Sequence, residues 1–336
     1  MKRNCIKILS FILAATMVVG CSKSDDFVPV EFSVATINVD GLPTNASFIP
    51  LNSDGPGAEY TPLIGSYLMK RGYDFVGVQE NFEYNDLLCA VLDNSYDHDA
   101  WGGGVLPSSL QVDLSNWRSY SDGLGGFWKK NHKVTFTERA MWEDGYGRIL
   151  FGSDRLATKG FRRYEIEIEG QPVVVYNLHM DASTTLSESV GLDNNDRKAR
   201  LNQWRQLRNH IMERLDDRPV IVLGDMNSYY ARDSVKAVFI DAIQATGRAM
   251  VGDVWIELNR DGIYPQMEVV PVTADEGVEG NLHQGESLDK ILYINPIRGL
   301  KLKPVSVSLD TKAYRRPDGK PLGDHFPLAA TFRIEK

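Results

Sequence analysis

Basic residues, cysteines and long apolar runs are all scarce in this sequence. The chain of 336 residues carries 37 Lys and Arg against 45 Asp and Glu, which gives a formal charge of −8. A general nucleic-acid binder owes most of its affinity to Lys and Arg on phosphates, so this balance argues against that class. The apolar run Ile8 to Val19 is too short to cross a bilayer, which takes a helix of about 20 residues. The 43% of apolar and 24% of charged residues nevertheless supply a large core and exclude general disorder.

The first residues have the composition of a targeting signal. The run Ile8 to Val19 fits the apolar region of a secretory signal peptide. Three basic residues precede it: Lys2, Arg3 and Lys7. We therefore expect residues 1–20 to be removed, which leaves 34 basic residues against 45 acidic ones, a formal charge of −11.

The end of this run carries a second signal. Val18-Val19-Gly20-Cys21 resembles the lipobox of bacterial lipoproteins, in which the cysteine is lipidated and becomes the first residue. The resemblance implies that residues 21–31 are a lipidated Cys21 followed by a polar tether. Ser22 to Asp26 is similar to the acidic export tag that some Gram-negative bacteria use for lipoproteins of the outer face. We expect an outer-membrane or cell-surface lipoprotein, held by acyl chains that contribute about 0.8 kcal/mol per buried methylene.

Cysteine is almost absent from the rest of the chain. Cys5 leaves with the signal and Cys21 carries lipid, so only Cys89 remains. The sequence therefore predicts neither a disulfide framework nor a cysteine-based zinc site. Cys89 lies in the apolar segment Leu87 to Leu92, where we expect a small buried hydrophobe rather than a nucleophile.

Short β-rich runs recur along the chain and helices lie between some of them. The expected strands are Phe32 to Ile37, Phe75 to Val78, Gly125 to Trp128, Phe161 to Ile168, Val173 to Tyr176, Val220 to Leu223, Ile291 to Ile294 and Leu328 to Ile334. Thr61-Pro62 offers a helix start and Gly72 a stop. Apolar residues recur on one face over roughly Arg197 to Leu215, and another helix is expected near Asp233 to Thr246.

Strands outnumber helices and arrive in pairs, and no repeat of about 20 to 50 residues is present. This pattern favours an α+β fold, a mixed-sheet sandwich with outer helices, over a parallel βαβ array. Residues 28–336 contain no linker, and residues 32–336 are expected to form a single domain. The pair Arg162-Arg163 has Glu165, Glu167 and Glu169 close by, so we expect it on an exposed strand face.

Several expected strands end in residues that contribute little to structure but suit chemistry. These clusters are Asn38-Val39-Asp40, Gln79-Glu80-Asn81, Asn177-Leu178-His179, Gly224-Asp225-Met226-Asn227, Ser287-Leu288-Asp289 and Gly323-Asp324-His325. Each one alone is best explained as a turn or a solvated residue. Together, at successive strand ends, they predict side chains that converge on one rim, where loops on a rigid scaffold carry function.

The set contains what hydrolysis of a phosphoester needs. Glu80 and Asp324 are hard oxygen ligands of the kind that Mg²⁺ takes, usually one or two carboxylates plus phosphate oxygens. His325 would act as a base toward water, with Asp289 as the carboxylate that fixes its tautomer. His179 and Asn227 are candidates to donate hydrogen bonds to phosphate oxygens, whose charge rises in the transition state.

In this order, the motifs resemble the endonuclease/exonuclease/phosphatase superfamily with the DNase I-like fold. The matching residues are Asn38-x-Asp40, Gln79-Glu80, His179, Gly224-Asp225-x-Asn227, Asp289 and Asp324-His325, and they span about residues 32–334. The resemblance implies a four-layer α/β/β/α sandwich of two packed mixed sheets with outer helices. It also implies a metal-dependent phosphoric diester hydrolase, without fixing the substrate, since members cut DNA, RNA, inositol phosphates and sphingomyelin.

Carried over residue by residue, the resemblance also implies a role for each position. Glu80 would be the central ligand of Mg²⁺, or of Mn²⁺ or Co²⁺, with Asn38 and Asp324 close to the same ion. The other implied roles are Asp225 and Asn227 positioning water and phosphate, His325 as base, His179 stabilising the pentacoordinate phosphorus or assisting the leaving group, and Asp40 and Lys159 contacting substrate. Which histidine plays which role stays open, and Lys159 is equally well explained as a solvated strand start.

Three stretches favour the bacterial neutral sphingomyelinases within this superfamily. They are Arg155 to Phe161, which resembles a Lys-Gly element before a central strand, Asn177 to Ser183, and Arg200 to Trp204. Asn38 to Leu42, in contrast, is equally similar to abasic-site endonucleases. The segment between Asp289 and Asp324 also lacks an obvious Trp-Phe hairpin tip, which secreted sphingomyelinases use to dock on membranes.

We therefore expect a monomeric phospholipid head-group hydrolase tethered to the membrane by its N-terminal anchor. An extracellular nuclease is the first alternative, although the mature charge of −11 disfavours a basic nucleic-acid groove. A phosphatase for inositol phosphates uses the same chemistry. A surface binding lipoprotein with a dead site is a remote alternative, because none of the core residues is missing.

Overall fold

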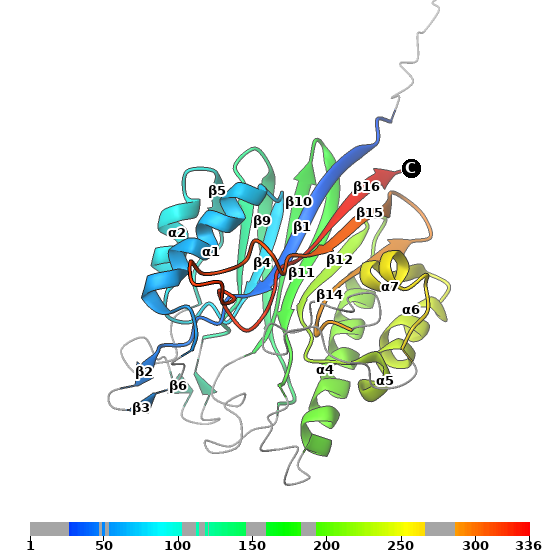
Figure 1. Cartoon of the computed structure of the whole chain (residues 1–336). Helices are drawn as coiled ribbons and strands as arrows, with labels where there is room; N and C mark the ends of the chain where they lie inside the picture. The colour runs from blue at the N-terminus through cyan, green and yellow to red at the C-terminus, as the bar shows by residue number, and fades with distance from the viewer. Residues whose placement is uncertain are drawn as a thin grey trace, which may run out of the picture.

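The chain forms two six-stranded sheets with helices outside them (Figure 1). The computed structural model describes residues 27–46, 49–50, 54–102, 112–113, 118–119, 121–145, 159–182, 193–265 and 286–336. The expected signal peptide and the expected lipidation site Cys21 lie outside these residues, as does most of the Arg155 to Phe161 stretch.

The first sheet has the strand order β15-β16-β1-β4-β8-β5. Its strands are β1 (Val30–Asn38), β4 (Phe75–Gln79), β5 (Tyr96–His98), β8 (Gly125–Lys129), β15 (Lys301–Leu309) and β16 (Leu328–Glu335). The sheet is mixed, because β1 pairs with β16 antiparallel and with β4 parallel.

The second sheet has the order β13-β14-β12-β11-β10-β9 and is also mixed, since only β11 and β12 are parallel neighbours. Its strands are β9 (Lys133–Met141), β10 (Gly160–Ile168), β11 (Gln171–His179), β12 (Val220–Asp225), β13 (Ala249–Asp253) and β14 (Asp289–Pro296). Two short pairs lie apart from both sheets: β2 (Asn45–Ala46) with β3 (Ile49–Pro50), and β6 (Val112–Asp113) with β7 (Arg118–Ser119).

Helices cover the outer face of each sheet, which gives four layers (Figure 1). The first sheet is covered by α1 (Gly57–Arg71) and α2 (Asn85–Leu92). The second is covered by α4 (Asp193–Arg214), α5 (Tyr230–Asp233), the π-helix η1 (Lys236–Asp241), α6 (Ala242–Gln244) and α7 (Val254–Asn259). The α/β/β/α sandwich expected from the sequence is confirmed. Within the described ranges, no helix is both long and apolar enough to span a bilayer.

Alternation along β1 shows how the sequence builds two cores at once. Val30, Phe32 and Val34 belong to the core between the sheets, whereas Ala35 and Ile37 pack in the outer core under α1 and α2. Successive side chains of a strand point to opposite faces, so one strand serves both cores. All eight expected strands are present, and the structure adds strands such as β9, β13 and β15 that the sequence analysis did not predict.

Two helix predictions need correction. The first helix begins at Gly57 rather than at Thr61, because Tyr60 donates its backbone N–H to the Pro56 carbonyl and adds a turn ahead of the expected start. Thr61 caps nothing and instead donates its hydroxyl to the Gly57 carbonyl (2.6 Å). The helix expected near Asp233 to Thr246 is present but begins after Ser234, whose φ of 54° is left-handed and ends α5; it continues as η1 and α6 to Gln244.

Candidate active site

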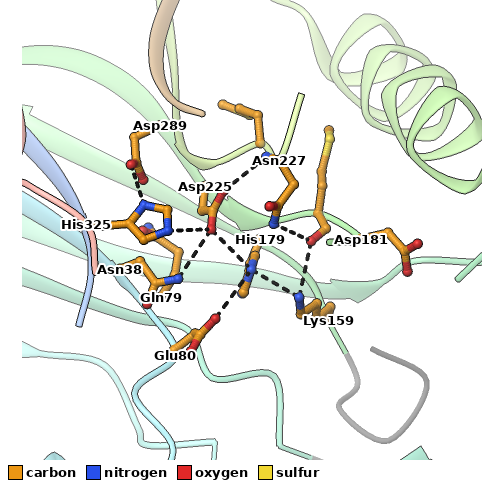
Figure 2. A network of polar contacts seen from close by, with 12 residues as sticks. Asn38, Gln79, Glu80, Lys159, His179, Asp181, Asp225, Asn227, Asp289 and His325 are labelled. Carbon is orange, nitrogen blue, oxygen red and sulfur yellow. Dashed lines mark hydrogen bonds and ion pairs between the residues drawn. The ribbon is translucent and has the colours of Figure 1, made fainter. Parts of the chain in front are cut away.

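Strand register brings the polar strand ends together. In the first sheet Asn38 pairs with Gln79 across the parallel strands β1 and β4, so the residues that follow both strands emerge at one edge. In the second sheet Asp225 of β12 pairs with His179 on one side and with Asp289 on the other. Because the sheets pack face to face, the residues from both sheets meet at one end of the sandwich (Figure 2).

One half of the site is a row of two carboxylates and an imidazole. The Nδ1 atom of His325 lies 2.6 Å from Asp289 Oδ2, and its Nε2 atom lies 3.7 Å from Asp225 Oδ2. All three side chains are buried. Burial alone would lower the pKa of His325, but the carboxylates of Asp289, Asp324 and Asp225 raise that pKa well above its ordinary value. The imidazole therefore holds a positive charge between acidic neighbours.

The other half is built around His179 at the end of β11. Its Nε2 atom lies 3.4 Å from Asp225 Oδ2, 3.1 Å from Lys159 Nζ and 3.9 Å from Glu80 Oε1 (Figure 2). Burial, with Lys159 and His325 adding positive charge, lowers the pKa of His179 well below its ordinary value. His179 is thus a neutral imidazole, and the indole N–H of Trp142 fixes its backbone by donating to the His179 carbonyl (2.7 Å).

Acidic oxygens face each other beside the two imidazoles. Burial and the nearby carboxylates of Asp324 and Asp225 together raise the pKa of Glu80 to about 7, although Lys159 and a hydrogen bond from Asn38 act in the opposite direction. The Oδ1 atom of Asp324 and the Oδ1 atom of Asp289 are buried without a hydrogen-bond partner among the described residues. A buried carboxylate oxygen left in this state is costly unless a cation or a ligand satisfies it.

Asn38, Asp40 and Asn227 hold the loops of the site. Asn38 donates its side-chain N–H to Asp225 Oδ2 (3.2 Å) and accepts the backbone N–H of Asp40 (2.9 Å). Asn227 donates its backbone N–H to Asp225 Oδ1 (3.0 Å) and its side-chain N–H to the Met180 carbonyl (3.1 Å). Lys159 is also inside rather than on a solvated face, so the alternative of a solvated strand start is wrong for it.

The backbone of the site adopts unfavourable conformations at three positions. Asp40, Glu80 and Asn227 have φ angles of 49°, 55° and 47°, in the left-handed region that side chains other than glycine seldom adopt. Such residues cost of order 1–3 kcal/mol each and persist only where the surroundings impose them, most often at functional sites. Gly224, directly before Asp225, has a φ of 145° and approaches Leu178 so closely that a Cβ there would overlap the Leu178 carbonyl oxygen.

A polar bridge that was not predicted from the sequence supports this site from below. Gln79 donates its side-chain N–H to Asn177 Oδ1 (2.7 Å) and Thr36 Oγ1 (3.1 Å), and Asn177 donates to the carbonyls of Val78 and Gly125 (3.0 and 2.9 Å). This bridge joins the two sheets directly under Glu80. One signal for this bridge was available in the sequence. Along β1, the residues that face the second sheet are apolar until Thr36, which is polar.

A further correction concerns the pair Arg162-Arg163, since both residues are buried rather than on an exposed face. The guanidinium of Arg162 donates to Asp122 Oδ1 and Oδ2 (2.7 and 2.8 Å) and to Asp99 Oδ2 (2.6 Å). Both aspartates come from segments distant in sequence, and a buried cation needs such partners. The expectation of an exposed face, which rested on the glutamates of the same strand, is therefore wrong.

Every described residue of the predicted site lies in this cluster or in the loops that it holds. The donor set is dominated by carboxylate and amide oxygens, which suits a hard divalent cation. One group of three potential ligand atoms, from Asp225, Asp289 and His325, lies within 4.8 Å of one another. The pKa of Glu80 is raised, and one oxygen of Asp324 has no hydrogen-bond partner among the described residues. Both carboxylates therefore fit the same kind of ion. Asp181, which follows His179 closely in sequence, lies at the side of the network (Figure 2).

Comparison with known proteins supports the architecture. No protein-family model matches the chain, and no curated protein matches its sequence. Among solved structures, D. rerio TDP2 complexed with a single-strand DNA product matches with a TM-score of 0.57 and 17% identity, covering 90% of this chain and 98% of that one.

Two bacterial structures are similar to the same extent. An endonuclease/exonuclease/phosphatase family protein from Bacteroides thetaiotaomicron has a TM-score of 0.54 and 18% identity, with 92% of this chain and 100% of that chain covered. A Staphylococcus aureus beta toxin mutant with bound magnesium ions has a TM-score of 0.54 and 18% identity, with coverage of 90% and 99%. These likenesses confirm the DNase I-like fold that the motifs predicted.

Proposed function

We propose that this chain is a divalent-cation-dependent phosphodiesterase that hydrolyses the head group of a phospholipid, with sphingomyelin-like lipids as the first candidates. The observation that carries the proposal is the buried cluster in which Asp225 contacts both His325 and His179 while Glu80 and Asp324 lie beside it. Four strand ends that are far apart in sequence supply these groups.

Glu80 and Asp324, with Asn38, are the residues that would hold the cation. The Oδ1 atom of Asp324 has no hydrogen-bond partner among the described residues, and the carboxylates of Glu80 and Asp324 repel each other. Both observations support this assignment, and the beta toxin neighbour carries bound magnesium ions. Mg²⁺ is the first candidate, with Mn²⁺ and Co²⁺ as alternatives. When bound, such an ion supplies Lewis acidity toward the phosphate oxygens.

The remaining residues of the site bind the phosphate, orient the water or transfer the proton. His325 moves a proton at Nε2, because its Nδ1 atom is occupied by Asp289. Asp225, held by Asn38 and Asn227, orients the attacking water, and Asn227 and Lys159 contact the phosphate. His179, neutral and fixed by Trp142, donates a hydrogen bond to the phosphorane oxygens or to the leaving group.

The choice of a lipid rests on sequence and charge. The stretch that contains Lys159, the loop that contains His179, and the helix segment Arg200 to Trp204 resemble the bacterial neutral sphingomyelinases. The lipobox-like segment at Cys21 would place the enzyme on a membrane as an outer-membrane or cell-surface lipoprotein, so an aromatic docking hairpin is less needed. We expect Asp40 to contact the head group from its loop and the protein to act as a monomer.

A polynucleotide is the second candidate substrate. The observation that favours it is the likeness to D. rerio TDP2, which was solved with a single-strand DNA product. The acidic balance of the chain opposes it, because nucleic-acid affinity depends on Lys and Arg contacts to phosphates.

The test is a substrate panel with the purified full chain in detergent: sphingomyelin, phosphatidylcholine, inositol phosphates, and single- and double-stranded DNA, each with Mg²⁺ and with EDTA. We expect release of the phosphorylated head group from sphingomyelin that EDTA abolishes and that Glu80→Gln reduces at least about 100-fold. Glu83→Gln, an exposed carboxylate in the same loop, is the matched control and should retain full activity. Cleavage of DNA without lipid hydrolysis would replace the first substrate class by the second, and EDTA-insensitive turnover would contradict the cation-dependent mechanism.

A further inference from the structure

A second group of potential metal ligands lies on the outer side of the first sheet, apart from the active site. It consists of Cys89 on α2, Asp93 directly after that helix, and His98 at the end of β5. One ligand atom from each residue lies within 4.8 Å of the other two. Unlike the catalytic cluster, this group contains a sulfur atom, and α2 and the edge strand β5 supply it rather than the strand ends (Figure 1).

Local structure brings the three side chains together. Cys89 and Asp93 are four residues apart at the end of α2, where Asp93 donates its backbone N–H to the Cys89 carbonyl (2.8 Å), so both side chains lie on one helix face. A short turn leads into β5, whose pairing with β8 places His98 opposite Phe127. Each ligand thus comes from a backbone position that hydrogen bonds fix.

Hydrogen bonding determines which nitrogen of His98 is available. Its Nδ1 atom lies 2.8 Å from the backbone carbonyl of Asp99, and because a carbonyl only accepts, Nδ1 carries the proton. In the neutral ring this leaves the lone pair on Nε2, which lies 3.5 Å from Asp93 Oδ1. Histidine ligands of metals commonly donate their second N–H to a backbone carbonyl in this way.

The carbonyl that orients His98 is itself in a rigid setting. Asp99 accepts hydrogen bonds from the Arg162 guanidinium (2.6 Å) and from the Tyr164 hydroxyl (2.5 Å), and its Oδ1 atom accepts the backbone N–H of Gly126 (3.1 Å). The residues that hold Asp99 in place thus belong to the second sheet and to β8, and not only to the loop. A preset imidazole lowers the cost of ordering when a metal binds.

We propose that Cys89, Asp93 and His98 bind a borderline-soft divalent ion of the Zn²⁺ class. A thiolate, an imidazole and a carboxylate match zinc in ligand type, and three protein ligands leave one tetrahedral position for water. The exposed fractions of the Asp93 and His98 side chains, 59% and 35%, keep that position open to solvent. The site differs from the catalytic one, where hard oxygens dominate, and it departs from the expectation that the sequence holds no cysteine-based zinc site.

Binding at this site has a defined proton balance. Burial, together with the carboxylates of Asp93 and Asp86, raises the pKa of the Cys89 thiol to about 11, so the thiol is protonated at neutral pH. The bond from sulfur to the metal forms as the S–H bond breaks, and one proton leaves to solvent. The bound ion would link α2 to the edge strand β5 and should stabilise this face of the protein.

The test uses the full chain with Co²⁺ as a spectroscopic probe and Zn²⁺ as competitor. We expect a thiolate-to-cobalt charge-transfer absorption in the wild type that Zn²⁺ abolishes. Cys89→Ala should remove the absorption, and His98→Gln should weaken Zn²⁺ binding at least about 100-fold, since even a group that only orients a ligand contributes 10–100-fold. The absorption requires sulfur, so occupation of the catalytic site by Co²⁺ does not produce it.

Two controls separate this site from its surroundings. Asp97→Asn changes an exposed carboxylate beside the proposed ligands and should leave the absorption unchanged. Zn²⁺ should raise the unfolding temperature of the wild type and of Asp97→Asn but not of His98→Gln, whose substituted side chain is partly exposed and compatible with folding. A wild type without the charge-transfer absorption, or an absorption that persists in Cys89→Ala, would overturn the proposal.

Discussion

The pair Asp74–His132 is partly buried and the pair Asp289–His325 is buried, and the two differ in how completely their hydrogen bonds are satisfied. Asp74 directly precedes β4 and contacts His132 Nε2 (2.9 Å), Lys129 Nζ (2.9 Å) and the backbone and hydroxyl of Ser33 (2.8 and 2.9 Å). Glu80 directly follows the same strand, about 20 Å away, in the cluster that contains the second pair, Asp289 and His325.

The second pair is short but incomplete. Asp289 contacts His325 at 2.6 Å, yet its other oxygen has no partner among the described residues, and His325 also faces Asp225 and Asp324. Residue type alone therefore does not distinguish a carboxylate that stabilises the fold from one that takes part in chemistry. A carboxylate whose oxygens are all satisfied stabilises the fold, whereas a carboxylate left partly unsatisfied among other charges is available to a ligand.

The largest difference between the two pairs should appear in turnover when each imidazole is removed. His325→Ala takes away the group that we propose moves the proton, so we expect phosphodiester hydrolysis to fall by about 10³-fold. His132→Ala should leave kcat within about twofold while lowering stability. Steady-state kinetics on the best substrate of the panel checks both, and equal losses in the two variants would remove the distinction.

A smaller effect is expected from Asp289, the carboxylate that contacts the imidazole of His325. Asp289→Asn should lower kcat by about 10²-fold, because the ring loses its fixed orientation. The carboxylate also raises the pKa of His325, so its removal should shift the limb of the pH–rate profile governed by His325 to lower pH. A profile that keeps its shape and position would show that His325 titrates independently of Asp289.

At the other pair the loss should be one of stability. Lys129, His132 and Ser33 outweigh burial and hold the pKa of Asp74 well below its ordinary value, so Asp74→Asn should lower the free energy of unfolding by about 2 kcal/mol at pH 7. The folded-state pKa is lowered, so the stabilisation is present above the unfolded pKa of about 3.9 and fades as the pH falls below it. Denaturant titrations at pH 7 and pH 3 measure this; an effect that does not shrink at pH 3 would contradict it.

The two lysines give the smallest contrast. Lys159→Met removes the cation beside His179 and should lower kcat by about tenfold, while the pKa of His179 rises toward its ordinary value. Lys129→Met removes a half-exposed partner of Asp74 and should cost less than about 1 kcal/mol of stability with kcat unchanged. Kinetics and denaturant titration of both variants, side by side, decide whether the two cations differ in role.

The strand ends were the most predictable part of this molecule. Alternating apolar runs place the strands, and residues such as Asn38 and Glu80 interrupt those runs where a sandwich has its rim. No single strand reveals that these strand ends converge. That part of the prediction came from the order of the motifs, which resembles the DNase I-like fold.

Long-range partners were not predictable in the same way. The burial of Arg162 depends on Asp99 and Asp122, which lie 63 and 40 residues away and have no spacing that links them to β10. The proximity of Cys89 and His98 depends on the pairing of an edge strand of only three residues. Short edge strands and ion pairs between distant loops carry no periodic signal.

The central claim is that residues from separate strand ends form one cation site, and calorimetric titration of Mg²⁺ tests it most directly. The wild type and Asp74→Asn should bind Mg²⁺ with equal affinity, and Glu80→Gln should bind it at least about tenfold more weakly. Unchanged Mg²⁺ affinity in Glu80→Gln would contradict the account.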